Sequence, residues 1–565
     1  MSRLTLLGLS VAVFGGVTTA QPARPQPTTA PFTVVEATIA EMRTAMERGR
    51  TTSRAIVQQS LDRIAKYEGR LNAVITLNPR ALDDAAARDE ERRRGRVRGP
   101  LHGIPIALKD NIHTTDMPTT GGALAFAALV PPYEATLTTR LRAAGAVIVA
   151  KTVMTELANW VASDMPTNYS ALAGFGFNPY DPRPDPRPGS DGRPALPPGG
   201  SSSGIGTAAS LWAANVGTET SGSILNPASR TMLVGIKPTV GRISRYGVIP
   251  ITADQDTPGP MARTVADAAT LLGVLEGDAP DPHDAATRAC APPPRHDYTA
   301  YLRTGALKGA RIGVPRAFFY DAVQVPDGRG TSGGLAAPER EAMNAAIAAL
   351  KQAGATIVDP ADLPSVRAPA GETLEDWPVC SGLAGAKGRD SRCSIVFKYG
   401  MKRDFNVWLA SLGAAAPVKS LTELRAWNRA HESEGALKYG QAQLDISDEI
   451  DLAADGDRYQ RDRAKDVRLG GSEGIGAALR AHTLDALLFP GPIGAAVAAK
   501  PGYPTVIVPF ATIPGPLTGA LPGFDPKPSP FGVSFTAGAC SEPRLIALAY
   551  AFEQATKRRR APVLE

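Results

Sequence analysis

The chain has 565 residues, of which 43% are hydrophobic and 21% are charged. These proportions are ordinary for a globular protein with a large core, and they exclude a fibrous or intrinsically disordered chain. The formal net charge of +6 is mild for this length, and the one dense basic run, residues 557–560, is typical of a solvated helix end, so nucleic acid is not an expected partner.

The N-terminal segment predicts export. Arg3 is followed by an apolar run, LTLLGLSVAVFGGV, and then by small residues suited to cleavage after Ala20. The run is shorter than a bilayer span requires, so we interpret residues 1–20 as a signal peptide and not as a stable membrane anchor. We therefore expect a secreted or periplasmic protein, in which residues 21–33 form a poorly ordered Pro/Thr-rich lead-in.

Helical and strand-like patterns alternate along the rest of the chain. Helical patterns begin at Thr51 and continue at residues 81–94, 134–144, 265–276, 339–353 and 543–557. Short apolar runs predict buried strands at residues 73–77, 104–108, 146–150, 311–314, 486–489 and 505–509. The alternation predicts an α/β architecture with helices on both faces of a sheet. Two stretches interrupt the pattern and are interpreted as insertions, namely residues 178–198, which contain eight prolines, and residues 332–403.

The four cysteines fit an exported protein. Cys380 and Cys393 are the favoured disulfide pair, because they are close in sequence and flank a polar segment that lacks a periodic apolar face. The partners of Cys290 and Cys540 stay open, since four cysteines allow three pairings. The spacing of the cysteines is not that of a zinc site, and no histidine-rich cluster accompanies them.

Residues 199–227 carry the candidate chemistry. They contain serine clusters at residues 201–203 and 221–223, and Lys109 lies upstream, directly after a predicted strand. A serine hydroxyl is a weak nucleophile until a base accepts its proton, and a buried lysine with a lowered pKa can be that base. We expect residues 215–223 to form a loop whose backbone N–H groups point into one cavity, as an oxyanion hole requires.

The same residues admit other interpretations. By composition alone a Gly/Ser-rich segment is more typical of a linker, and a single lysine is more typical of a surface or an ion pair, for which Asp110 is at hand. No Gly-Lys-Ser/Thr follows the glycines, so a phosphate-binding loop is a poor match. Residues 200–204 match G-x-S-x-G, which would make Ser202 the nucleophile of an α/β-hydrolase, but the proline-rich segment before them cannot be the central strand that such an elbow needs.

Several motifs resemble the amidase signature family of serine amidohydrolases. They are PLHGIPIALKDNI from Pro100, PGGSSSG from Pro198, GTETSGSILNPA from Gly217 and VGIKPTVGRISRYGVIP from Val234. The resemblance continues through DTPGPMARTVADAATLL, LDALLFPG and GVSFTAGACSEPRLIALAYAFEQATKRR, and so covers nearly all of the mature chain. The Glu-Thr-Ser-Gly-Ser version is more similar to the peptide-amidase and acylamidase branch than to the tRNA-dependent amidotransferase subunits.

The resemblance implies a fold and a set of roles. The fold would be a single large α/β/α domain, residues 34–565, around a central mixed, mostly parallel sheet. Ser223 matches the nucleophile, Ser201 the bridging serine on a cis peptide, and Lys109 the base. The backbone N–H groups that would hold the oxyanion belong to Thr220, Ser221, Gly222 and Ser223. The spacing of 22 between Ser201 and Ser223 is shorter than the family usually has, which leaves open whether Ser201 or Ser202 is the bridging residue.

The implied reaction is hydrolysis of a linear C–N amide bond, in a peptide amide or an acylamide, through an acyl-enzyme. The substrate would be a small-molecule or peptide amide, the mechanism needs no metal or organic cofactor, and the protein would be a monomer or homodimer. Two alternatives remain at this stage: a carbamate or ester hydrolase of the same fold, and an exported binding protein that has lost the chemistry.

Overall fold

The computed structural model describes residue 1 and residues 31–324, 330–369, 371–517 and 523–564. The chain divides into a first unit, residues 1–32, and a second unit, residues 33–565. The predicted signal peptide beyond Met1 and residues 21–30 of the lead-in lie outside the described residues. The candidate chemistry lies entirely in the second unit.

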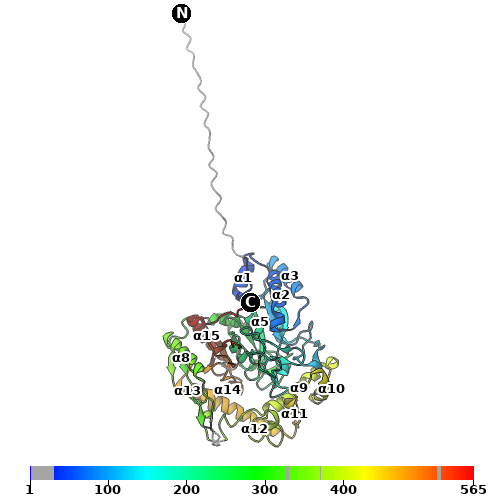
Figure 1. Ribbon diagram of the computed structural model, residues 1–565. Coiled ribbons are helices and arrows are strands. Elements are labelled where there is room, and N and C mark those ends of the chain that lie inside the picture. Colours follow the sequence, from blue (N-terminus) through cyan, green and yellow to red (C-terminus); the bar gives the residue numbers. More distant parts are fainter. Residues whose placement is uncertain (2–30, 325–329, 370, 518–522, 565) are drawn as a thin grey trace. The chain divides into compact units, whose positions relative to one another are not determined.

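One mixed sheet organises the second unit (Figure 1). Its strands, in the described part of the chain, follow the order β1-β3-β2-β6-β8-β7-β14-β15-β13-β9-β12. Their bounds are β1 (Val74–Leu77), β2 (Pro105–Lys109), β3 (Val147–Thr152), β6 (Ala214–Glu219), β7 (Val234–Lys237), β8 (Thr257–Ala262), β9 (Arg311–Gly313), β12 (Thr356–Val358), β13 (Ala486–Pro490), β14 (Thr505–Ile513) and β15 (Ser529–Thr536). Two small hairpins pair β4 (Tyr169–Ser170) with β5 (Gly174–Phe175), and β10 (Val323–Gln324) with β11 (Thr331–Ser332).

The sheet is mixed, as predicted, but antiparallel pairs outnumber parallel pairs among the described strands. Only the pairs β2–β3, β2–β6, β9–β12 and β9–β13 are parallel. The expectation of a mostly parallel sheet is therefore wrong. Parallel neighbours need a crossover connection, whereas β14 and β15 follow one another in the chain and pair antiparallel, as do β7 and β8.

Helices cover both faces of this sheet. Every residue of β2, β3, β6, β7, β8, β13 and β15 is buried, and successive side chains of a strand point to opposite faces, so neither face of these strands is open to solvent. The helices are α1 (Ile39–Glu47), α2 (Ser53–Leu71), α3 (Ala81–Arg93), α4 (Thr136–Ala143), α5 (Ile205–Ala208), α6 (Leu225–Arg230), α7 (Val265–Glu276), α8 (Ala337–Gln352), α9 (Val396–Ser411), α10 (Leu421–Ala430), α11 (Ala442–Asp448), α12 (Gly456–Val467), α13 (Gly476–His482), α14 (Ala495–Ala499) and α15 (Glu542–Thr556). The α/β architecture is thus as predicted.

Helix α2 illustrates how the sequence specifies these elements. The Thr52 side chain caps the first turn by accepting from the Ala55 N–H, and Asn72 ends the helix in the left-handed conformation. Val57 and Ile64 are buried in one core cluster with Val147 and Val149 of β3. Helix α2 also packs on α3, which follows β1.

The two predicted insertions differ in the structure. Residues 178–198 contain isolated β-bridges but no helix or strand. Residues 332–403 do not form one irregular segment, because α8 and β12 lie within them and β12 extends the main sheet. The irregular remainder carries the disulfide between Cys380 and Cys393, the pair favoured by the sequence. Cys290 is bonded to Cys540, a pairing that the sequence left open.

Candidate active site

Lys109 is the last residue of β2, and its side chain is completely buried. Its Nζ lies 2.9 Å from Ser201 Oγ, 2.8 Å from Thr218 Oγ1 and 3.3 Å from the Thr218 carbonyl oxygen. Strand β2 pairs in parallel with β6, so Lys109 and Thr218 reach the same carboxyl edge of the sheet. The strand thus delivers the amine to the serine cluster, as the position of Lys109 after an apolar run predicts.

Lys109 has no ion-pair partner among the described residues. Asp110, its neighbour in sequence, is instead 3.2 Å from Lys151 Nζ, and both of these side chains are fully buried. Burial lowers the pKa of Lys109 to about 7, against the smaller opposite effect of the Asp256 and Glu219 carboxylates. Near neutral pH a large fraction of the protein therefore holds a neutral amine at this position.

The first serine cluster lies in a tight turn, which we call the serine turn (residues 199–202). Gly199 and Gly200 have φ values of +80° and +51°, which favour glycine. A Cβ at Gly200 would lie 2.3 Å from Pro227 Cδ, so a side chain does not fit there. The peptide bonds of the turn are trans, and the described chain has its cis bond at Asp359–Pro360, so the expected cis peptide at Ser201 is not found.

Ser201 and Ser202 point to different partners. Ser201 Oγ contacts Lys109, whereas Ser202 Oγ donates to the Thr218 carbonyl at 2.9 Å and accepts from the Thr218 N–H at 3.1 Å. The structure therefore places Ser201, and not Ser202, beside the lysine. The Ser202 N–H donates to the Ser223 carbonyl at 3.1 Å, which joins the two serine clusters through the backbone.

The second cluster follows β6 in a segment that we call the nucleophile loop (residues 220–223), after the role expected of Ser223. The loop expected at residues 215–223 is wrong for residues 215–219, which belong to β6. The Ser221 side chain is exposed, and Ser223 is 9% exposed, so the loop meets the surface. Neither Ser223 Oγ nor the four backbone N–H groups of the loop bond to a described residue, which leaves a hydroxyl and a set of donors free for a ligand.

Buried groups hold both ends of the nucleophile loop. Glu219 Oε2 accepts from the N–H groups of Ile224 and Leu225, at 2.7 and 2.9 Å, directly after Ser223. Thr220 Oγ1 donates to Asp256 Oδ1 at 2.5 Å. Burial raises the pKa of Asp256 to about 7, although its hydrogen bonds oppose this. The loop is thus fixed at its base and open at its tip.

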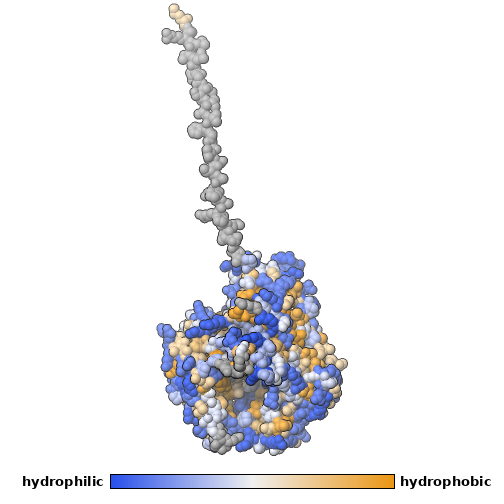
Figure 2. Space-filling model, viewed as in Figure 1, coloured by the Kyte–Doolittle hydropathy of each residue, from blue (hydrophilic) through white to orange (hydrophobic). Residues whose placement is uncertain are grey.

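Gly222, with a φ of +89°, brings the loop close to α14. A Cβ added there would lie 3.7 Å from Ala495 Cβ, the first residue of α14. Figure 2 shows that the face seen in Figure 1 is mostly hydrophilic and is hollowed beside the position of α14. A small cavity is lined by Asn111, Thr218, Thr220 and Asp256 among others, and it shares Thr218 with the contacts of Lys109.

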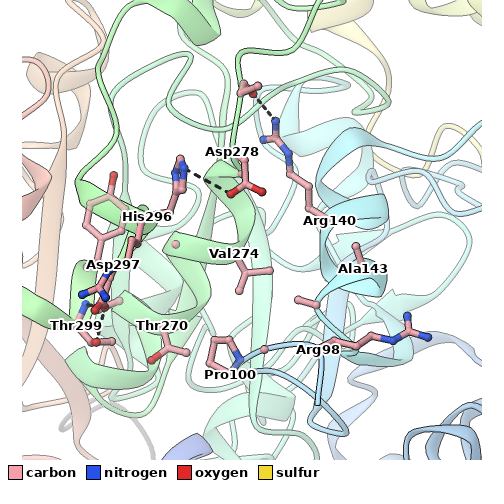
Figure 3. A pocket seen from close by; sticks show the side chains of 18 of the residues that line it. Arg98, Pro100, Arg140, Ala143, Thr270, Val274, Asp278, His296, Asp297 and Thr299 are labelled. Carbon is pink, nitrogen blue, oxygen red and sulfur yellow. Dashed lines mark hydrogen bonds and ion pairs between the residues drawn. The ribbon is translucent and has the colours of Figure 1, made fainter. Parts of the chain in front are cut away.

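A larger surface pocket, of about 920 Å³, involves other elements (Figure 3). It lies between α4, α7 and residues 295–299, with Arg140 and His296 on its walls. Arg140 is engaged with the Ala279 carbonyl at 2.9 Å, and His296 lies 3.5 Å from Asp278. None of Lys109, Ser201 and Ser223 lines it. Size alone therefore does not mark this pocket as the site of the chemistry.

Comparison with known proteins decides the family. Residues 55–368, more than half of the chain, match the family described as Amidase. The chain belongs to this family. An Arabidopsis thaliana protein named as an amidase is 33% identical over 564 residues, which cover 99% of this chain and 96% of that protein. The resemblance that the motifs indicated is confirmed.

Solved amidases share the fold. A peptide amidase from Stenotrophomonas maltophilia is 37% identical, with a TM-score of 0.78, over 94% of this chain and 99% of that one. An amidase family protein from Bacillus anthracis is 29% identical, with a TM-score of 0.77, over 94% and 93%. The protein is therefore an amide hydrolase, and its large mixed sheet is the sheet of this amidase fold.

The described residues contain no group of three or more His, Cys, Asp or Glu side chains arranged to hold a metal ion. In the same part of the chain, no helix is long and apolar enough to span a membrane.

Sequence reasoning missed three residues that shape the site. Thr218 accepts from Lys109, Asn111 Nδ2 donates to Thr218 Oγ1 at 3.1 Å, and Asn168 contacts the serine turn. Asn111 stands in the motif that ends LKDNI, so its position could have drawn attention. Thr218 stands in the motif GTETSGSILNPA, so its position could also have drawn attention. Asn168 lies 31 residues from the serine turn that it contacts, and no local pattern marks it.

Proposed function

We propose that this amidase is an exported enzyme that hydrolyses peptide amides or acylamides through an acyl-enzyme, with Ser223 as nucleophile, Ser201 as relay and Lys109 as base. The observation that carries the proposal is the 2.9 Å contact between Lys109 Nζ and Ser201 Oγ at a buried site. The backbone bond from Ser202 to Ser223 supports it, because it keeps the nucleophile loop beside that contact.

The proposed proton path adds one contact to those described: on substrate binding, Ser223 Oγ comes within hydrogen-bond distance of Ser201 Oγ. Neutral Lys109 accepts the proton of Ser201 as Ser201 accepts the proton of Ser223. Ser223 Oγ bonds to the amide carbon, and the carbonyl electron pair moves onto oxygen, facing the free N–H groups of the nucleophile loop. When the C–N bond breaks, the proton on Lys109 returns through Ser201 to the leaving nitrogen. Water then attacks the acyl-enzyme along the same path and releases the carboxylic acid.

The substrate class rests on the relatives. The Stenotrophomonas neighbour is a peptide amidase, and it spans 94% of this chain at 37% identity. The exposed tip of the nucleophile loop, at Ser221, is compatible with a substrate that extends beyond the site. We therefore place a C-terminal peptide amide or an acylamide ahead of a carbamate or ester.

A substrate panel on the mature protein tests this proposal. We expect ammonia release from peptide amides, or amine release from acylamides, to exceed turnover of matched carbamates and esters, and we expect Ser223→Ala to abolish it. Activity that survives Ser223→Ala would refute the nucleophile assignment. Absence of turnover together with absence of fluorophosphonate labelling at Ser223 would favour the silent binding protein.

Export is tested separately. Two disulfides, one of them joining residues 250 apart in sequence, are consistent with an oxidising compartment. We expect the protein recovered from the periplasm or medium to begin at Gln21, as read by N-terminal sequencing. A cell-associated protein that retains Met1 would contradict cleavage after Ala20.

A further inference from the structure

The four carbonyl groups of the serine turn need partners, because this turn belongs to no helix or strand and is largely buried. Asn168 and Thr155, from a single segment before the turn, supply all of these partners. Asn168 Nδ2 lies within hydrogen-bond distance of three carbonyl oxygens, at 2.9 Å from Gly199, 3.0 Å from Gly200 and 3.4 Å from Ser202. The Thr155 N–H donates to the remaining carbonyl, that of Ser201, at 3.2 Å.

The Thr155 side chain also connects Asn168 to the serine turn. Its Oγ1 donates to the Gly200 carbonyl at 3.2 Å and accepts the Asn168 N–H at 2.7 Å. Both side chains are completely buried. Because the contacted atoms are all carbonyl oxygens, only the NH2 end of the Asn168 amide fits toward the turn. The two residues form one hydrogen-bonded support beneath the serine turn.

The backbone of Asn168 is itself unusual. Its φ is +58°, a conformation that asparagine tolerates better than most residues. Leu157, Ala158 and Asn159, in the same segment, also have positive φ. Left-handed backbone costs roughly 1–2 kcal/mol per such residue, so the surrounding contacts must hold this segment in place.

We propose that Asn168 is a positioning residue for the relay serine: its amide, together with Thr155, fixes the carbonyls of the serine turn so that Ser201 stays on Lys109. The proposal rests on the proposed role of Ser201. Nothing in it requires Asn168 to contact the substrate.

Asn168→Asp tests the proposal, since it keeps the shape of the side chain and removes the donors. We expect kcat to fall about 100-fold with KM changed less than threefold, as for a small displacement of a reacting group. Asn168→Gly, which keeps the left-handed backbone, should lower kcat by a smaller factor. This second variant keeps the test decisive if Asn168→Asp fails to fold. The matched control is Asn72→Asp, because Asn72 is also left-handed and donates to two carbonyls, at 2.7 and 2.9 Å, outside the serine turn.

A double-mutant cycle separates positioning from general destabilisation. The readout is the rate of fluorophosphonate labelling at Ser223. In a Ser201→Ala background, Asn168→Asp should change this rate less than twofold, because its effect passes through Ser201. Full activity of both Asn168 variants, or losses that multiply with Ser201→Ala, would overturn the proposal. If Ser201→Ala and Ser223→Ala alone remain active, the proposed function fails instead.

Discussion

Lys109 Nζ and Ser201 Oγ are 2.9 Å apart, and neither side chain is more than 1% exposed. A protonated lysine has three hydrogens to donate, and Ser201 Oγ, Thr218 Oγ1 and the Thr218 carbonyl supply three acceptors. A neutral amine can keep its two bonds to Thr218 and turn its lone pair toward Ser201. One geometry therefore accommodates both protonation states of the lysine.

The pH dependence of activity should follow Lys109. Only its neutral form accepts a proton, and its pKa is lowered to about 7, so kcat/KM should rise with pH and reach half of its plateau near pH 7. The measurement is kcat/KM on a neutral amide between pH 5 and 9. A profile that is flat across pH 6–8, or that falls as pH rises through 7, contradicts the role of base.

Asp256→Asn should shift this profile. The Asp256 carboxylate raises the pKa of Lys109, so removing its negative charge should move the rising limb to lower pH. Asp110→Asn is the control, since Asp110 is also buried and next to Lys109 in sequence but pairs with Lys151. We expect Asp110→Asn to lower the free energy of unfolding and to leave the limb in place. Equal shifts in both variants would refute a specific influence of Asp256.

The sequence predicted Lys109 and the two serine clusters better than it predicted strand β6, which lies between the clusters in the chain. Lys109 follows a clear apolar run, and Ser223 stands in a motif shared with a family, so both could be named in advance, whereas Ser201 and Ser202 stayed alternatives. Strand β6 was missed because Asn215, Gly217 and Thr218 break any apolar pattern. Thr218 is buried where it bonds to Lys109 and Ser202, and at such a position local propensity is a poor guide.

The expectation of a mostly parallel sheet was the other error. Parallel and antiparallel buried strands have similar apolar runs, so the runs at residues 104–108 and 505–509 predicted strands correctly without indicating that β2 pairs in parallel and β14 antiparallel. Strand pairing depends on contacts between distant segments, such as β9 with β13. No local sequence pattern encodes such contacts.

Ser201→Ala and Ser202→Ala should separate relay from structure. Ser201 contacts Lys109, so its loss should lower kcat about 100- to 10,000-fold with little effect on stability. Ser202 instead bonds twice to the Thr218 backbone, so its loss should cost about 1–3 kcal/mol of unfolding free energy. Urea unfolding and steady-state kinetics on both variants decide this. A Ser202→Ala variant that is stable but inactive would reverse the assignment.

The two disulfides should differ in what they contribute. In the chain-entropy model the stabilisation grows with loop length, so the Cys290–Cys540 bond, across 250 residues, should contribute roughly 5 kcal/mol and the Cys380–Cys393 bond, across 13, roughly 3 kcal/mol. Paired Cys→Ala variants measured by urea unfolding test the order. A larger loss for the Cys380/Cys393 variant would show that native contacts, and not loop closure, dominate.

Glu219→Gln should loosen the nucleophile loop. The glutamine can still accept from the Ile224 and Leu225 N–H groups, but the bonds lose their charge, so we expect unfolding to become easier by about 1–2 kcal/mol. Because the Glu219 carboxylate also raises the pKa of Lys109, the rising limb of the pH profile should move to lower pH. Glu542→Gln is the control: Glu542 is equally buried and accepts from the Thr239 N–H at 2.7 Å, yet it does not contact the loop. It should lose stability while the pH profile stays unchanged. An equal shift of the rising limb in both variants would refute a specific influence of Glu219 on Lys109.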